Sequence, residues 1–215
     1  MFYELIDTGD SRSFPERGTL HDKAEREGDA VVIIGEKAGQ ALATLSARDN
    51  KVAVLIELGI EPLGVHTGEA RGDEGSNVLG FARFRLGTAE PTKLVEVVRQ
   101  PRSPDTAIAA AKEIFEALGL EVAVCGDVDG RIVDRLVRPY YNAALRRLDE
   151  SLATADDLDT TLKLGLGYPV GPISLLESTG LAEHYDVTQA LYEALGDQGY
   201  APARRARVAK QRQKS

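Results

Sequence analysis

The chain has 215 residues and a formal net charge of −8. That length allows one large domain or two modest ones with a real core, and the negative charge argues against nucleic acid as the main partner. No apolar run approaches the roughly 20 residues of a membrane-spanning helix, so no membrane partner is expected. Cys125 is the only cysteine, which rules out an internal disulfide and favours a cytoplasmic location. No spacing typical of a metal site occurs, so no metal is expected.

The first part of the chain alternates apolar runs with segments of helix-forming residues. Strands are expected at residues 2–6, 29–34, 51–60, 78–84, 93–98 and 121–125. Helices are expected at residues 35–48 and 103–119, and residues 7–23 and 64–77 are expected to be loops. Ser103 stands where it can cap the second helix, with Pro104 in its first turn and Gly119 at its end. Such alternation is typical of a mainly parallel sheet with helices on its faces.

After Gly130 the pattern becomes helical throughout. Apolar residues recur at helical spacing from residue 132 to residue 153, with Pro139 expected to mark a bend or a junction. Thr154 and two following aspartates are expected to begin another helix, and two more helices follow. The sequence therefore predicts an α/β domain at residues 1–128 and a helical domain at residues 129–215. The basic tail is expected to be a solvated terminal helix, the alternative being an anion-binding arm; its residues are Arg204, Arg205, Arg207, Lys210, Arg212 and Lys214.

Two runs in the helical half carry a specific pattern, GRIVDRLVRPYYNAAL and DDLDTTLKLGLGYPVGPISLLESTGL. With the upstream KLVEVVR they resemble the 3-hydroxyacyl-CoA dehydrogenase family, from about Lys93 to Leu181. The resemblance implies an abbreviated Rossmann-like sheet followed by a helical domain like the C-terminal domain of 6-phosphogluconate dehydrogenase. It also implies pairing of two subunits through the helical domain. The segment from Gly167 to Pro172 is expected to be a tight turn between helices, with Pro172 opening the second.

In this family a histidine takes the proton of the 3-hydroxyl group while hydride passes to NAD, and a glutamate orients that histidine. The resemblance places Glu96 at the glutamate position and puts Asp134 where the family has an asparagine that contacts the substrate. The histidine position falls on Ala82 when it is counted from Gly80, or on Phe84 when it is counted back from Lys93. Neither side chain can act as a base, and a carboxylate at position 134 can only accept hydrogen bonds.

The cofactor loop also departs from the family. A dinucleotide fold needs Gly-x-Gly-x-x-Gly after its first strand, and the nearest candidate, Gly35 to Gly39, has Lys37 at the second glycine position and is a residue short. In that register Glu57 falls near the ribose-binding acid. In a second register, which we prefer, residues 30–34 and 51–58 are the family's fourth and fifth strands, and the first half of the nucleotide domain is reduced to about thirty residues. Either register predicts no strong NAD binding.

Three functions remain open. The first is a non-dehydrogenase relative that keeps the fold and the homodimer and binds an acyl-CoA or a partner protein. The second is an altered enzyme that uses Glu96 and Asp134 as a carboxylate pair. The third is an active NAD-dependent oxidoreductase of 3-hydroxyacyl-CoA, in fatty acid metabolism, in which a group such as His66 replaces the lost base.

Three arginines favour the first function. Arg83, Arg85 and Arg131 are placed where they could neutralise the carboxylates of Glu96 and Asp134, which are expected to face one cavity. A guanidinium within hydrogen-bond reach would keep a carboxylate ionised and make it part of a structural cluster.

Overall fold

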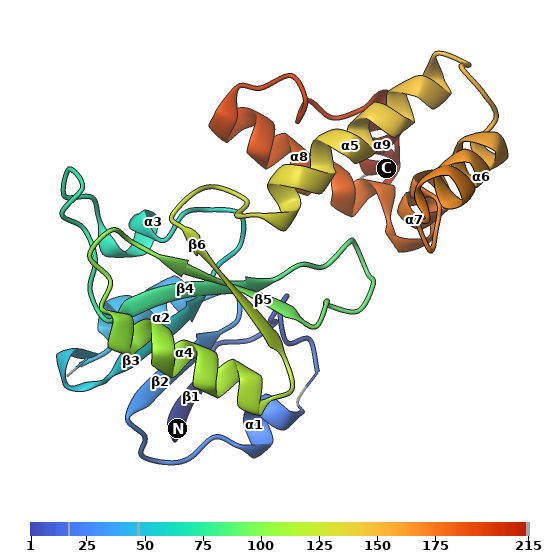
Figure 1. Cartoon of the computed structure of the whole chain (residues 1–215). Coiled ribbons are helices and arrows are strands. Elements are labelled where there is room, and N and C mark those ends of the chain that lie inside the picture. Colours follow the sequence, from blue (N-terminus) through green and yellow to red (C-terminus); the bar gives the residue numbers. More distant parts are fainter. Residues whose placement is uncertain (17, 47, 214–215) are drawn as a thin grey trace. The chain divides into compact units, whose positions relative to one another are not determined.

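The computed structural model describes residues 1–16, 18–46 and 48–213, and these residues form two compact units. Unit 1 comprises Met1–Phe84 and Pro91–Ile132, and unit 2 comprises Arg85–Glu90 and Val133–Ser215. Unit 1 is the α/β part and unit 2 is helical (Figure 1). The segment Arg85–Glu90 joins unit 2 because it is held there by long-range backbone contact, for example from the Thr88 N–H to the Thr179 carbonyl oxygen at 2.8 Å.

Unit 1 is built on one six-stranded sheet whose spatial order, β1-β2-β3-β4-β5-β6, is the order of the chain. The strands are β1 (Tyr3–Asp7), β2 (Ala30–Ile34), β3 (Ala53–Glu57), β4 (Val78–Arg83), β5 (Leu94–Arg99) and β6 (Glu121–Gly126). All neighbouring pairs are parallel except β4 and β5. The helices of the unit are α1 (Thr19–Asp22), α2 (Ala38–Thr44), α3 (Gly64–Thr67) and α4 (Asp105–Ala117), with a 3-10 turn η1 (Arg48–Asn50).

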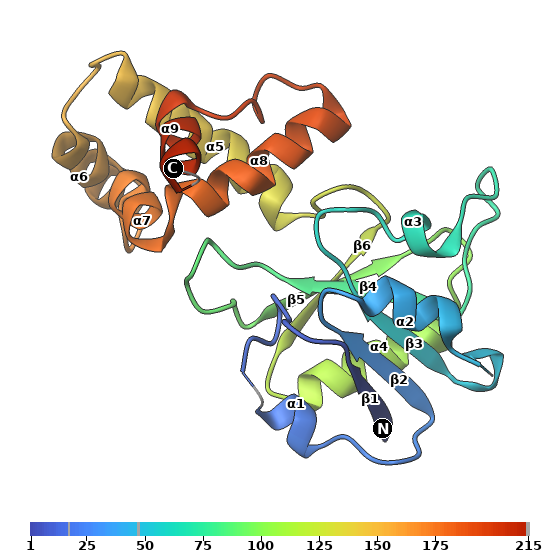
Figure 2. The same cartoon turned by 180° about the vertical axis from the view of Figure 1, so that it is seen from behind.

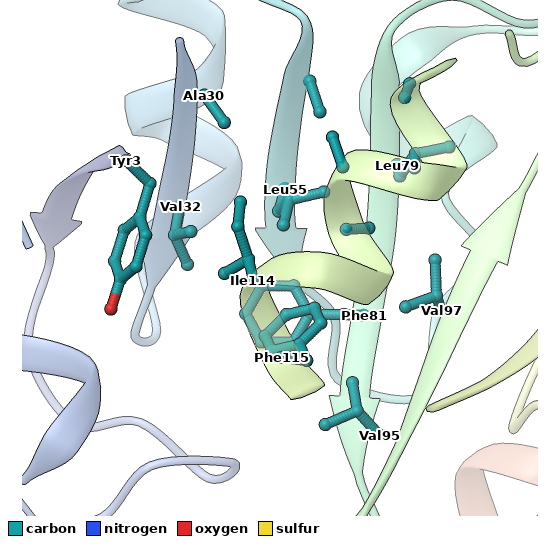
Figure 3. Packing of buried hydrophobic residues seen from close by; sticks show 14 of the residues in the cluster. Tyr3, Ala30, Val32, Leu55, Leu79, Phe81, Val95, Val97, Ile114 and Phe115 are labelled. Carbon is teal, nitrogen blue, oxygen red and sulfur yellow. The ribbon is translucent and has the colours of Figure 1, made fainter. Parts of the chain in front are cut away.

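Both faces of the sheet are buried, which explains why its central strands are continuous apolar runs. Successive residues of β2, such as Val31 and Val32, belong to separate clusters on the two faces. Helix α4 covers one face, where Phe81 and Phe115 pack at 5.0 Å between ring centroids (Figure 3). Helix α2 covers the other face, as the two opposite views show (Figures 1 and 2).

The connection from β1 to β2 is unusual. It packs on the α4 face through Leu20 of α1, whereas the connection from β2 to β3 packs on the opposite face through Leu42 of α2. Since the three strands are parallel and consecutive, these two connections have opposite hands, although right-handed crossovers are the rule. This arrangement is what remains when the second and third strands are removed from the usual dinucleotide-fold order 3-2-1-4-5-6, leaving 1-4-5-6. The strand order therefore fits the second register, in which β2 and β3 are the family's fourth and fifth strands.

Some local predictions were wrong. Ser103 does not cap α4: Pro104 is the N-cap, and the Ser103 hydroxyl instead accepts from the Gln100 N–H at 3.1 Å. The predicted loops at residues 7–23 and 64–77 each contain one turn of helix, α1 and α3. At the start of α3 the Leu63 and Gly64 N–H groups donate to Asp127, the residue after β6, a contact that no local pattern reveals.

Unit 2 is a group of helices, α5 (Val133–Asp149), α6 (Ala155–Leu166), α7 (Pro172–Thr179), α8 (Leu181–Leu195) and α9 (Arg204–Gln213). The Thr154 hydroxyl caps α6 by accepting from the Asp157 N–H, and Pro172 is the first residue of α7, as expected. The Asp159 carboxylate accepts from the Ile173 and Ser174 N–H groups at the start of α7. A Cβ on Gly171 would lie 2.1 Å from the Asp159 carboxyl carbon, so this turn requires glycine there.

Much of the basic tail forms α9 and contacts the other helices of unit 2. Arg204 and Arg205 both pair with Asp149, and Lys210 pairs with Asp186. These contacts agree with the terminal-helix interpretation of the tail; Lys214 lies outside the described residues.

Candidate functional site

Glu96 lies on β5 with its carboxylate almost fully buried. It accepts a hydrogen bond from the Ile132 N–H at 2.7 Å, and the Arg131 guanidinium lies 3.9 Å away and is buried with it. Arg131 also donates to the Gly59 carbonyl oxygen at 2.6 Å. The ion pair between Glu96 and Arg131 is one of those expected from the sequence.

The residue beside Glu96 on the next strand is Ala82. In the antiparallel register of β4 and β5 the two residues stand directly opposite each other, so their Cβ atoms are roughly 5 Å apart on one face of the sheet. Ala82, the histidine position expected when counting from Gly80, therefore lies next to Glu96, the expected glutamate position. Phe84, the result of the other count, follows the last residue of β4. In this chain a methyl group occupies the place beside Glu96.

Asp134 lies in the first turn of α5 and pairs with Arg138, which is not one of the three arginines expected from the sequence. Arg138, one turn further along α5, donates from Nε to the Asp134 carboxylate at 2.6 Å, and its side chain is fully buried. The expectation that Arg83, Arg85 or Arg131 neutralises Asp134 thus needs correction, since its carboxylate has this nearer partner within its own helix. The i, i+4 spacing of aspartate and arginine was the signal that could have revealed it.

Arg83 and Arg85 have other contacts. Arg83 donates to the Thr92 and Ser13 carbonyl oxygens, at 2.8 Å each, and its guanidinium lies 5.1 Å from the centre of the Phe14 ring. Arg85 donates to the Ala89 carbonyl oxygen at 2.7 Å. Both arginines therefore help to fix loop backbone.

The Arg138 guanidinium continues into a buried polar network between α5 and α8. It lies 3.0 Å from Nδ1 of His184, whose Nε2 lies 3.0 Å from the Asn142 amide oxygen. Asn142 in turn donates to the Thr188 hydroxyl at 2.7 Å. Burial, together with the nearby Arg138 cation, lowers the pKa of His184 to about 3, so the imidazole is neutral at ordinary pH. The polarity of the residues around His184 in sequence gave no sign that it is buried.

The carboxyl ends of β1, β2 and β3 are where a dinucleotide fold would bind its cofactor. Between β1 and the next helix that the structure describes, which begins only at Thr19, the chain has two widely separated glycines, Gly9 and Gly18. Glu57, at the end of β3, accepts hydrogen bonds from the Ser13 N–H at 2.6 Å and the Gly35 N–H at 2.8 Å. Each carboxylate oxygen thus already binds a backbone amide of a neighbouring loop.

A pocket of about 300 Å³ lies at this edge, lined among others by Arg12, Glu57, Glu61 and His66. His66, on α3, has Nε2 3.3 Å from the Glu61 carboxylate. The Glu61 pKa is lowered to about 2: burial alone would raise it, but hydrogen bonds from His66 and the Gly59 N–H outweigh that effect. The structure thus brings His66 together with a carboxylate, in a different place from Glu96 on β5.

Neither a metal centre nor a membrane segment is found in the described part of the chain. Within residues 1–16, 18–46 and 48–213, no three histidine, cysteine or acidic side chains are grouped so that they could hold a metal ion. No helix in these ranges is long and apolar enough to cross a membrane.

Known proteins similar to this chain agree on one family. Residues 130–214 match the model of the 3-hydroxyacyl-CoA dehydrogenase C-terminal domain. A 3-hydroxybutyryl-CoA dehydrogenase of Bradyrhizobium diazoefficiens is 36% identical over 51% of this chain and 38% of its own length. The human mitochondrial hydroxyacyl-coenzyme A dehydrogenase is 40% identical over 41% of this chain and 28% of its own length. The chain therefore spans well under half of the curated relatives that it matches.

Solved structures give the same result for the fold. The (S)-3-hydroxybutyryl-CoA dehydrogenase of Ralstonia eutropha is similar with a TM-score of 0.67 at 25% identity, over 84% of this chain and 64% of that one. FadB2 of Mycobacterium tuberculosis is similar with a TM-score of 0.71 at 22% identity, over 90% of this chain and 68% of that one. Residues 130–214 thus match the C-terminal domain of the 3-hydroxyacyl-CoA dehydrogenases in sequence, and the chain as a whole is similar in fold to solved dehydrogenases of this kind.

Proposed function

We propose that this chain is a family member that does not catalyse the NAD-dependent oxidation of 3-hydroxyacyl-CoA. The observation that carries the proposal is the pair Ala82 and Glu96, which face each other across β4 and β5. Oxidation of a secondary alcohol needs a group that accepts the hydroxyl proton while the hydride leaves. An alanine at the position beside the glutamate cannot accept a proton.

The ion pairs argue against the altered enzyme that would use Glu96 and Asp134 as an acid/base pair. Each carboxylate has a buried arginine in its own unit, Arg131 for Glu96 and Arg138 for Asp134. Both carboxylates are thus engaged by buried guanidinium groups, which suits a structural ion pair better than proton exchange with a substrate. That the two carboxylates share one cavity stays a prediction.

NAD binding is also absent in this proposal. Among the described residues no helix begins directly after β1 to receive a pyrophosphate, since α1 begins only at Thr19. The loop after β1 is instead packed into the core, where the Phe14 ring stacks on Phe115 at 6.5 Å between centroids. Even in the first register, which puts Glu57 near the ribose-binding acid, its carboxylate is already occupied by two backbone N–H groups.

What the chain retains, we propose, is the paired helical domain and with it an acyl-CoA or a protein as ligand. Unit 2 exposes large apolar side chains along the end of α6 and the turn that follows; they are Leu164, Leu166, Tyr168 and Val170. Leu164 is 83% exposed, which is costly for a monomer and typical of a contact surface. A homodimer built on this helical domain is the assembly that we propose.

The test is an assay for NADH production from 3-hydroxybutyryl-CoA and a longer homologue. We expect no rate above that without protein, with an active dehydrogenase of the family as the positive control. Turnover that scales with the concentration of this chain would refute the proposal.

One observation favours a second candidate, the active oxidoreductase. The pair His66 and Glu61 is the kind of imidazole–carboxylate pair that such chemistry uses, and it lines a pocket at the cofactor edge of the sheet. If turnover appears, His66→Ala should abolish it under this candidate. Retention of turnover in that variant would exclude His66 as the base.

A further inference from the structure

The Glu57 carboxylate joins two loops that leave the sheet at the same edge. Glu57 is the last residue of β3 and is 8% exposed. Its Oε1 accepts from the Ser13 N–H, in the loop after β1, and its Oε2 accepts from the Gly35 N–H, directly after β2. Distances of 2.6 and 2.8 Å are those of strong, charge-assisted hydrogen bonds.

Two backbone N–H groups that converge from successive parallel strands are what this edge of an α/β sheet offers to an anionic ligand. Gly35 has φ of +96°, a backbone conformation that costs glycine little. Arg12 brings a positive charge to the pocket at this edge, which is also lined by the carboxylates of Asp10, Glu36 and Glu61. We propose that the Ser13 and Gly35 N–H groups form an anion-binding corner for a phosphate or pyrophosphate group, and that Glu57 is its permanent internal occupant.

This inference rests on the proposed lack of NAD binding and gives it a mechanism. A phosphate that entered the corner would have to displace the carboxylate from both amides, and it would meet that negative charge at close range. The same carboxylate ties the loop after β1 to the sheet. The Glu57 carboxylate thus competes with any incoming phosphate for the hydrogen bonds of the Ser13 and Gly35 N–H groups.

The experiment uses the full chain and inorganic pyrophosphate, with binding followed by calorimetry and by the amide resonances of Ser13 and Gly35. Glu57→Ala frees both N–H groups, and Glu57→Gln frees one, since a side-chain amide has a single acceptor oxygen. Glu61→Gln is the matched control: it removes a carboxylate from the same pocket, but one that binds the Gly59 N–H instead. We expect about a tenfold or larger gain in pyrophosphate affinity for Glu57→Ala over wild type. Both resonances should shift, and Glu61→Gln should show no such gain.

Two results would overturn the inference. One is a folded Glu57→Ala chain that does not bind pyrophosphate more tightly than wild type. The other is an equal gain in pyrophosphate affinity for Glu61→Gln, which would show that the change in net charge alone causes the effect. If neither Glu57 variant folds, the wild-type chain decides. Its Ser13 and Gly35 amides should then each show a through-hydrogen-bond coupling to the Glu57 carboxyl carbon, and the absence of both couplings would end the inference. NAD binding by the wild-type chain would remove the proposed function as well, whereas failure of the variants alone would leave that function standing.

Discussion

Replacing Asp134 by Asn tests the buried ion pair between Asp134 and Arg138. The Arg138 side chain is 0% exposed and that of Asp134 is 6% exposed, so the pair is shielded from water. Removing one partner of a buried pair leaves an uncompensated charge, at a cost of about 3–5 kcal/mol. Asparagine keeps an oxygen that can still accept from Arg138, so we expect a smaller loss of unfolding free energy, roughly 1–3 kcal/mol.

The assay is urea unfolding followed by tyrosine fluorescence. The chain has no tryptophan, and of its seven tyrosines only Tyr3 lies in unit 1, so the signal reports on unit 2. Glu150→Gln is the matched control, because Glu150 pairs with Arg147 near the end of the same helix with both side chains more than half exposed. That variant should change stability by no more than about 0.5 kcal/mol. If Asp134→Asn costs as little as the control, the pair is not a structural element and the reasoning fails.

Three further outcomes are expected. The pKa of His184 is about 3 in the folded state and about 6.5 in the unfolded state, so the unfolded state takes up a proton first as the pH falls. Unit 2 should therefore lose stability below pH 6.5, by roughly 2 kcal/mol at pH 5. An unfolding free energy, measured by tyrosine fluorescence, that stays constant between pH 7 and pH 5 would contradict this. Gly171→Ala should lower the unfolding free energy by roughly 1–3 kcal/mol because of the clash at the start of α7. Gly165→Ala, in open space on α6, should be neutral or stabilising by up to about 1 kcal/mol. Equal effects of the two variants in urea unfolding would refute the turn geometry. Leu164→Glu should convert the proposed homodimer to a monomer, as measured by light scattering at micromolar concentration. If the wild-type chain is itself a monomer under these conditions, the homodimer proposal is wrong.

The sequence predicted the elements whose signals are local. The runs that form β2 and β3 are apolar throughout because both faces of the sheet are covered, and such runs are recognisable in one dimension. The Thr154 cap and Pro172 at the start of α7 follow from rules that involve three or four residues. Ser103 satisfied the same cap rule, but its hydroxyl binds the Gln100 N–H instead, so a local rule lost to a competing turn.

The candidate site was predicted less completely, because its contacts join distant segments. The arginine at position 131 was expected near Glu96, but Arg138 was missed although its spacing from Asp134 is that of a helical pair. The role of Glu57 depends on the Ser13 and Gly35 N–H groups, 44 and 22 residues away, and no pattern in the sequence predicts such contacts. The burial of His184 likewise depends on how α5 and α8 pack.

The most direct test of the central claim is a calorimetric titration of the full chain with NAD and NADH. Because Glu57 binds both loop amides and the described helix after β1 begins only at Thr19, we expect no heat of binding and no saturation at millimolar cofactor. A dissociation constant in the low micromolar range for either form would contradict the account.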